Sequence, residues 1–403
     1  MTTKSSYRDL SRRKLLTTSL GLGGAMLLSP TSLDARSDEL DTRVAQVMSG
    51  TIGIDMHNHV YPAGTEPHRT SQGDSHASGP QGRPPRQSDQ PRAEQAQPQD
   101  PELLLAEKLK RSGFTAVCAS FVLDFAAHDK PGDAREDLLR WFTAIDAQLE
   151  EGHIRRALNV KDLQAAHDHS QPTIVQSVEG SMFIEGHLDR VEEVYRRGLR
   201  HLQLLHERDD IVSPLGDVNT AAAHLGGLTL FGVQVIKECN RLGILVDLAH
   251  ASNETVLGAI KVSTEPFIVS HTSLNSRTGG DPKLVQMMWP RLISKEHAKV
   301  VADAGGIVGV WTHLAPTLPE FVESIKSMVD AIGVDHVGIG TDTDLLSSRV
   351  GSGTNRAWPG NTSGFLPTVV GEMLRQGFSK DEIQKIGGGN YCRVFAKVTT
   401  RYV

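Results

Sequence analysis

Residues 230–250 read LFGVQVIKECNRLGILVDLAH, and this stretch contains the two patterns that decide the fold. Residues 230–242 have an apolar residue every three or four positions, which is the periodicity of an amphipathic helix. Gly243 follows as a residue that commonly ends helices, and residues 244–248, apolar except for Asp247, are typical of a buried strand. His250 follows that run after one alanine. The stretch therefore predicts a helix, a strand and a polar residue at the end of the strand.

The same alternation of short apolar runs and longer helical patterns recurs along most of the chain. Repeated βα units of this kind predict a parallel sheet, and eight of them are the number that a TIM-type (β/α)8 barrel requires. The chain has 403 residues, which is enough for such a barrel as one large domain. We therefore predict an α/β fold of the TIM-barrel class. The eight expected strands cover residues 51–56, 114–120, 173–178, 199–205, 244–248, 267–270, 306–311 and 336–341.

Two segments depart from this pattern. Residues 1–35 combine Arg12 and Arg13 with a short apolar, glycine-rich run, which is typical of a twin-arginine export signal. Residues 62–100 are low in complexity and have almost no apolar side chains, so we expect a loop insertion within a barrel domain of residues 36–403. We expect the protein to be periplasmic or secreted. Since no other stretch approaches ~20 apolar residues, we expect no stable membrane span after signal removal.

The composition excludes some classes of partner. The formal net charge is -6 and the charged fraction is 22%, so there is no excess of basic residues and we expect no nucleic acid as a partner. The three cysteines, Cys118, Cys239 and Cys392, are widely spaced and include no CxxC pair, so we interpret them as small buried residues. The sequence leaves open whether the chain forms a homodimer.

Residues that can bind a metal follow six of the eight expected strands. In a TIM barrel the carboxyl ends of the strands meet at one rim, where active sites lie. Each of these residues alone could be an ordinary hydrogen-bonded side chain, but burying so many titratable groups at one rim is costly unless they bind a cation. Imidazole nitrogens with a carboxylate between them suit zinc and a bridge between two ions. The residues are His57 and His59 after the first strand, Glu179 after the third, His206 after the fourth, His250 after the fifth, His271 after the sixth and Asp342 after the eighth.

The other histidines do not follow this rule, and we interpret them as structural or solvated. Two, His68 and His76, fall in the polar insertion. Seven more lie on expected helices or loops, namely His153, His167, His169, His187, His224, His297 and His313.

Several of these stretches resemble, in order and with compatible spacing, the signature blocks of the renal dipeptidase, or membrane dipeptidase, family of zinc peptidases. The resemblance extends from about residue 52 to residue 395 and omits the polar insertion. It implies an amidohydrolase-like barrel and zinc-dependent hydrolysis of dipeptides to amino acids by a metal-bridging hydroxide. The blocks are residues 54–59, 178–180, 232–250, 266–273, 336–344 and 389–390.

The resemblance also implies a role for each candidate residue in the metal site. It implies two zinc ions per chain, with His57 and His59 on the first ion, Glu179 bridging both, and His250 and His271 on the second. The family usually has an aspartate where this chain has His59. Imidazole still binds zinc, so we expect His59 to be a ligand, although the site loses one negative charge.

Three further roles follow from the same resemblance. His206 matches the histidine that contacts the substrate carbonyl and its tetrahedral intermediate. Arg291 matches the arginine that holds the substrate carboxylate, and Asp342 matches the aspartate that handles the proton of the attacking water. The small dipeptide substrate is thus the expected partner, with no preference among dipeptides or D-residues indicated by the sequence.

Two other functions remain open. One is another binuclear amidohydrolase that cleaves a lactone, a cyclic amide or a phosphotriester. Such enzymes often carry a carboxylated lysine at the end of the fourth strand, whereas this chain has His206 there and no lysine nearby. The other is an exported zinc-binding or solute-binding protein without catalysis, for which Asp342 would be unnecessary.

Overall fold

The computed structural model describes most of the chain apart from the amino-terminal segment, the polar insertion and a few loops. By its internal contacts the chain divides into a short unit, Met1–Asp41, and a large unit, Thr42–Val403. Helix α1 (Pro30–Met48) crosses that boundary. Most of the expected export signal, residues 1–35, and nearly all of the expected insertion, residues 62–100, lie outside the described residues. The described residues are 30–62, 105–124, 128, 130–207, 213–277, 280–343 and 364–400.

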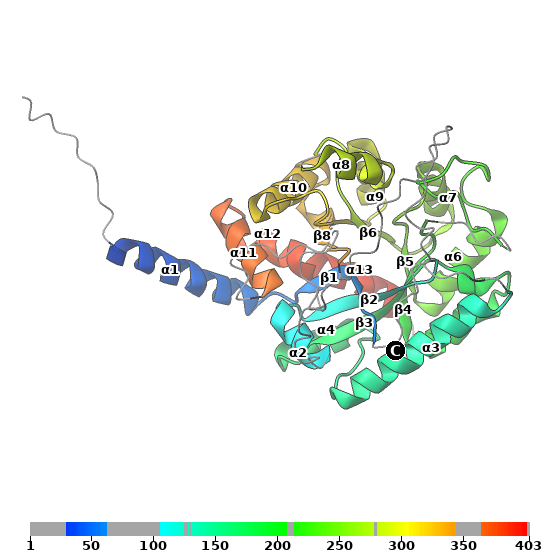
Figure 1. Ribbon diagram of the computed structural model, residues 1–403, viewed down its shortest axis with the longest axis horizontal. Coiled ribbons are helices and arrows are strands. Elements are labelled where there is room, and N and C mark those ends of the chain that lie inside the picture. Colours follow the sequence, from blue (N-terminus) through cyan, green and yellow to red (C-terminus); the bar gives the residue numbers. More distant parts are fainter. Residues whose placement is uncertain are drawn as a thin grey trace, which may run out of the picture. The chain divides into compact units, whose positions relative to one another are not determined.

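The large unit is built around eight parallel strands in sequential order, which form a nearly closed barrel (Figure 1). All eight strands are buried almost throughout, as expected when helices cover the outside of a parallel sheet. The strands are β1 (Ile54–His59), β2 (Ala116–Val122), β3 (Thr173–Glu179), β4 (Leu199–Gln203), β5 (Leu245–Asp247), β6 (Ile268–Thr272), β7 (Ile307–Val310) and β8 (Val337–Ile339).

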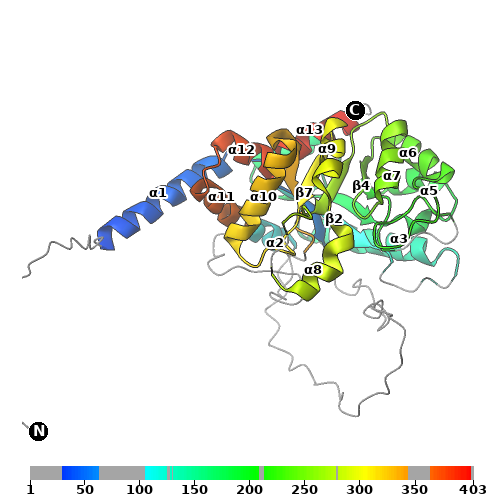
Figure 2. The same ribbon diagram turned by 90° about the horizontal axis from the view of Figure 1, so that it is seen from above.

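Helices connect successive strands and lie outside the barrel (Figures 1 and 2). The prediction of a TIM-type α/β barrel is therefore confirmed. The helices of this unit are α2 (Leu105–Ser112), α3 (Asp133–Glu151), α4 (Val160–Asp168), α5 (Asp189–Arg196), α6 (Leu230–Leu242), α7 (Asn253–Val262), α8 (Pro282–Met288), α9 (Lys295–Asp303), α10 (Leu318–Ile332), α11 (Phe365–Arg375), α12 (Lys380–Gln384) and α13 (Asn390–Thr399), with short turns η1 (Met182–Ile184), η2 (Trp289–Arg291), η3 (Val334–His336) and η4 (Lys385–Gly389).

Each expected strand overlaps an observed one, and helix α6 has the expected bounds. The side chain of Thr229 accepts a hydrogen bond from the backbone of Gly232 and so caps the start of α6, while Gly243, at φ 76°, ends it in the left-handed conformation. The main correction concerns β1. The strand begins at Ile54 and ends at His59, whereas residues 51–56 were expected. His57 and His59 therefore lie within the strand rather than after it.

An apolar cluster closes the amino-terminal end of the barrel. Inward-facing residues near the starts of the strands, among them Ile54, Ala116 and Ile307, pack with Tyr391 and Phe395 of α13. Met56 lies one layer higher in the same cluster. The carboxyl-terminal ends of the strands are left for polar side chains.

The first and last strands meet through a short seam. The backbone N–H of His59 donates to the carbonyl of Thr343 at 2.9 Å, and that of Asp342 donates to the carbonyl of His57 at 3.1 Å. Asp55 accepts hydrogen bonds from both the backbone and the hydroxyl of Thr341. The seam that closes the barrel therefore runs through candidate site residues.

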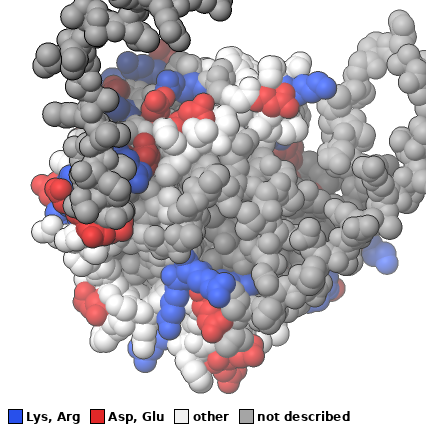
Figure 3. Space-filling model, turned by 60° about the vertical axis from the view of Figure 1, so that its left-hand side comes forward, with Lys and Arg blue, Asp and Glu red and all other residues white. Residues whose placement is uncertain are grey.

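The surface carries charges of both signs. On the face drawn in Figure 3, Lys and Arg side chains lie among Asp and Glu side chains of the described residues. Within the described part of the chain, none of the helices has the length and apolar character needed to cross a membrane. Cys118, Cys239 and Cys392 are buried free thiols, as predicted.

Candidate metal centre

Seven of the eight candidate residues lie together at the carboxyl-terminal rim of the barrel. His57, His59, Glu179 and His271 belong to the final residues of β1, β3 and β6. The other three are in the loops that directly follow β4, β5 and β8, namely His206, His250 and Asp342. The parallel strands thus gather side chains that are far apart in the sequence, as the barrel predicts.

Glu179 is at the centre of the cluster, and its two oxygens face different groups of histidines. Oε2 lies 3.2 Å from Nε2 of His57 and 4.0 Å from Nδ1 of His59. Oε1 lies 3.6 Å from Nε2 of His250 and 3.7 Å from Nε2 of His271. These atoms form two candidate metal sites that share the one carboxylate.

The charge states of the histidines differ between the two groups. Burial lowers the pKa of His57, but the nearby charges of Glu179 and Asp342 outweigh it and raise that pKa to about 9. Burial and the neighbouring His57 lower the pKa of His271 to about 4, and burial with His206 and His271 holds the pKa of His250 well below its usual range. His250 and His271 are therefore neutral at pH 7, which is the form of imidazole that binds metals.

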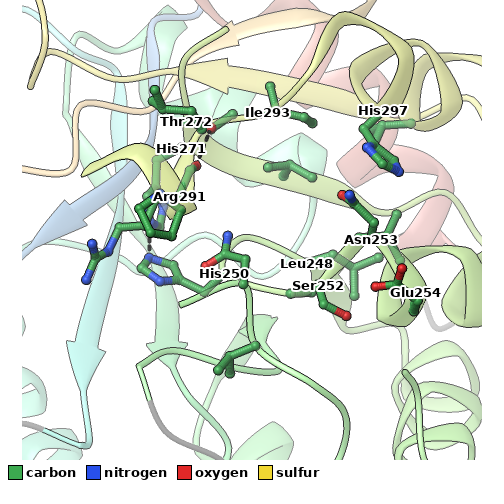
Figure 4. A pocket seen from close by; sticks show the side chains of 18 of the residues that line it. Leu248, His250, Ser252, Asn253, Glu254, His271, Thr272, Arg291, Ile293 and His297 are labelled. Carbon is green, nitrogen blue, oxygen red and sulfur yellow. Dashed lines mark hydrogen bonds between the residues drawn. The ribbon is translucent and has the colours of Figure 1, made fainter. Parts of the chain in front are cut away.

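The donor set fits a metal ion. His250 and His271 direct their Nε2 atoms at each other across 3.0 Å, and Figure 4 shows this contact. With Glu179 they supply two neutral nitrogens and one carboxylate oxygen, a combination suited to zinc. Both residues line a cavity of about 280 Å³, and Figure 4 shows their rings on its wall.

Gln203 and a serine support the ligand groups from behind. The side-chain amide of Gln203 donates to Oε1 of Glu179 at 3.1 Å. Nδ1 of His271 lies 2.9 Å from the hydroxyl of Ser270. Such outer contacts fix the orientation of a ligand and tune its affinity for the metal.

Asp342 lies among three imidazoles. Its Oδ1 is 2.9 Å from Nε2 of His59 and 3.8 Å from Nε2 of His57, while its Oδ2 contacts Nε2 of His313. Burial raises the pKa of Asp342, but the charges of His271 and His313 outweigh it and hold that pKa well below the usual range. His313, which we interpreted as structural or solvated, is buried at this site, where its ring contacts one oxygen of Asp342.

His206 is fixed by a second aspartate. Its Nδ1 contacts Oδ1 of Asp124, and its Nε2 lies 3.5 Å from Oε1 of Glu179. Burial lowers the pKa of His206, but the charges of Asp124 and Glu179 raise it more strongly, to about 10. His206 is therefore a hydrogen-bond donor at neutral pH, with Nε2 directed into the cluster.

Two of the site residues have a backbone conformation that L-amino acids rarely adopt. His250 has φ 65° and Asp342 has φ 52°, both in the left-handed region. Such a conformation costs about 1 to 3 kcal/mol and persists where the surrounding structure enforces it, commonly at functional sites. Here the carbonyl of His250 accepts a hydrogen bond from the backbone of Asn219, and the amide of Asp342 is held in the seam.

Arg291 is the eighth candidate, and it reaches the site through another residue. It lies in η2 and lines the same cavity as His250 and His271 (Figure 4). Its guanidinium donates from Nε and Nη2 to Oε1 of Glu207, and that oxygen is 3.9 Å from Nδ1 of His250. Arg291 is thus beside the cluster, with a carboxylate of the chain itself already bound to it.

Four residues of the site were not among the sequence candidates. Asp124 and His313 come directly after β2 and β7, so the rule used for the other strands could have identified them. Gln203 and Glu207 act through contacts between distant segments, for which the sequence carries no local signal.

Comparisons with known proteins agree with this geometry. The model of the family described as membrane dipeptidase, peptidase family M19, matches residues 88–402. The chain is similar to the dipeptidase verJ of Clonostachys rogersoniana, with 29% identity over 55% of this chain and 54% of that protein. It is also similar to the dipeptidase tcpJ of Claviceps purpurea (strain 20.1), with 28% identity over 51% of this chain and 46% of that protein. The chain thus matches about half the length of these curated relatives.

Solved structures share the fold. An amidohydrolase from Pseudomonas aeruginosa superposes with a TM-score of 0.66 at 20% identity, covering 89% of this chain and 99% of that one. The probable dipeptidase PvdM from the same organism gives 0.69 at 16% identity, covering 90% and 99%. A metallo peptidase from Rhodobacter sphaeroides, liganded with a phosphinate mimic of the dipeptide L-Ala-D-Ala, gives 0.60 at 18% identity, covering 72% and 89%.

Proposed function

The chain belongs to the membrane dipeptidase family, peptidase family M19, and from this premise we propose that it hydrolyses dipeptides to amino acids with two zinc ions. One observation carries the two-ion proposal. The oxygens of Glu179 are divided between two histidine groups, Oε2 toward His57 and His59 and Oε1 toward His250 and His271. A single buried carboxylate in that position suits a bridge between two cations.

The bound ions would supply the electrophilic part of the chemistry. They would lower the pKa of a water molecule toward neutrality and polarise the scissile carbonyl. The chain's own residues would orient the substrate, stabilise the developing charge and move the proton.

His206 is suited to stabilise charge on the substrate carbonyl oxygen. Asp124 fixes its Nδ1 side, so that Nε2 faces the cluster as a donor. A preorganised donor of this kind typically contributes about 3 kcal/mol to transition-state stabilisation. We assign His206 this role.

Asp342 is suited to carry the proton from the attacking water to the leaving amine. His59 and His313 contact its two oxygens and fix the carboxylate beside the first histidine group. A fixed acid or base at hydrogen-bonding distance is the requirement for this step. Arg291, on the cavity wall, would bind the terminal carboxylate of the dipeptide through charge-assisted hydrogen bonds.

We also propose that the protein acts outside the cytoplasm after export by the twin-arginine route. The support is the sequence of residues 1–35, with the paired Arg12 and Arg13 before an apolar run. That route carries folded proteins, which suits a barrel whose seam and site form together.

The function is tested with the purified, zinc-loaded chain and a panel of dipeptides with L- or D-residues at the carboxyl side. We expect release of free amino acids, loss of activity with a chelator, and a strong loss in Asp342→Asn with zinc content unchanged. Hydrolysis of lactones, cyclic amides or phosphotriesters instead would assign another amidohydrolase activity. Zinc binding without hydrolysis of any of these would favour the non-catalytic alternative.

A further inference from the structure

The guanidinium of Arg291 has a partner within the chain before any substrate arrives. Nε donates to Oε1 of Glu207 at 2.8 Å, Nη2 contacts the same oxygen, and Nη1 donates to the carbonyl of Met287 at 2.9 Å. Three of its five N–H groups are therefore engaged. Among the described residues, no further partner engages the remaining two donors, one each on Nη1 and Nη2.

Glu207 changes the charge of this wall of the cavity. The side chains of Arg291 and Glu207 are 20% and 31% exposed, so their charges are only partly screened by water. A carboxylate ligand that binds the free donors of Arg291 would lie close to the carboxylate of Glu207. The attraction of the guanidinium is then offset by repulsion from Glu207.

Glu207 is also part of the catalytic rim. It directly follows His206, and its Oε1 is 3.9 Å from Nδ1 of His250, with which it forms a possible ligand group. The repulsion therefore acts next to the place where the substrate is expected to bind.

We propose that Glu207 is a specificity-determining residue, which offsets the charge of Arg291 and extends the accepted substrates to dipeptides with a neutral, amidated carboxyl terminus. This inference rests on the proposed dipeptidase function. The substrate class is set by the net charge of the pair: a lone arginine selects carboxylates, whereas a paired arginine offers hydrogen bonds without net charge. Neutral amide oxygens can also accept hydrogen bonds from the guanidinium, and unlike a carboxylate they are not repelled by Glu207.

The test uses one dipeptide in two forms, with a free and with an amidated carboxyl terminus, and measures kcat/KM for both. In the wild type we expect the two values within about tenfold of each other. Glu207→Gln keeps a hydrogen-bonding side chain for Arg291 but removes the charge. We expect this variant to raise kcat/KM for the free dipeptide about tenfold, mostly through KM, and to change the value for the amidated form less than twofold.

Glu193→Gln is the matched control. Glu193, on α5 rather than at the rim, also pairs with an arginine: Nε and Nη2 of Arg135 donate to its two oxygens. We expect this control to leave both substrates unchanged. A ratio of free to amidated hydrolysis that stays within twofold of the wild type in Glu207→Gln overturns the proposal, as does a fall in free-dipeptide hydrolysis, which would mean that Glu207 only positions Arg291.

A binding measurement gives the same comparison without turnover. In zinc-loaded Asp342→Asn, calorimetric titration with the free dipeptide should give a Kd about tenfold lower once Glu207→Gln is added. An unchanged Kd contradicts the proposal. Failure of the proposed function looks different, because the wild type would then hydrolyse neither form of the dipeptide.

Discussion

Replacing Glu179 by glutamine tests the shared carboxylate directly. The two candidate metal sites proposed above have three protein ligands each, and Glu179 is the ligand that they share. The change therefore leaves two imidazoles at each site, His57 with His59 and His250 with His271. Loss of a supporting contact to a ligand typically costs 10- to 100-fold in metal affinity, so the loss of a ligand itself should cost at least 100-fold at each site, or about 2.8 kcal/mol.

The measurement is zinc content by elemental analysis after dialysis, followed by competition with a chelator. We expect the wild type to retain two zinc ions per chain and Glu179→Gln to retain one at most, weakly. Glu372→Gln is a suitable control, because this buried glutamate on α11 holds Arg375 and is not part of the metal centre. Two ions held by Glu179→Gln with affinities within threefold of the wild type would refute the bridging role.

Three further outcomes are expected. Changing Arg12 and Arg13 to lysine should leave the precursor in the cytoplasm; unchanged periplasmic recovery in cell fractionation would argue against twin-arginine export. His59→Asp should keep metal and some activity, whereas His59→Ala should weaken the first site at least tenfold in a zinc titration; equal affinity would make His59 structural. In the metal-free protein the pKa of His57 is about 9, against about 6.5 when the chain is unfolded, so protonation of His57 stabilises the fold most below pH 6.5. The free energy of unfolding should therefore fall between pH 6.5 and pH 9. Denaturant titrations in which His57→Asn shows the same fall would contradict this.

The barrel could be predicted from the sequence because its strands are buried on both sides. Runs such as residues 244–248 are apolar except for Asp247, and the helix before them has a distinct period, so both could be located from local pattern. The predicted start of β1 was less accurate than the boundaries predicted for that helix and strand. Residues 51–53 are as buried as a strand but come before the first paired residue, Ile54.

The metal centre followed from one rule, that polar residues at the ends of barrel strands converge. The rule identified His57, Glu179 and His271, and it would have identified Asp124 and His313 had it been applied to the second and seventh strands. Local sequence gives no sign of either residue's partner. The contacts of His313 with Asp342 and of Asp124 with His206 join loops that are distant in the sequence.

The pairing of Arg291 with Glu207 could not be predicted from the sequence for a similar reason. The two residues are on the loops after different strands, and their distance depends on how those loops fold over the rim. A motif indicates that an arginine is present, but its net effect on a ligand depends on which carboxylate lies beside it.

The seam between β1 and β8 links the chemistry of this protein to the stability of its closed barrel. The backbone hydrogen bonds that join β1 to the segment directly after β8 involve His57, His59 and Asp342, and the side chains of these residues converge on one side of the first candidate metal site. A cation there would act as a clasp across the edges of the sheet. At 100 times its Kd, a ligand that binds only the folded state adds about 2.7 kcal/mol. Removal of the metal would then open the barrel first between these two segments. The amide hydrogens of His59 and Asp342 would exchange with solvent before those of any helix.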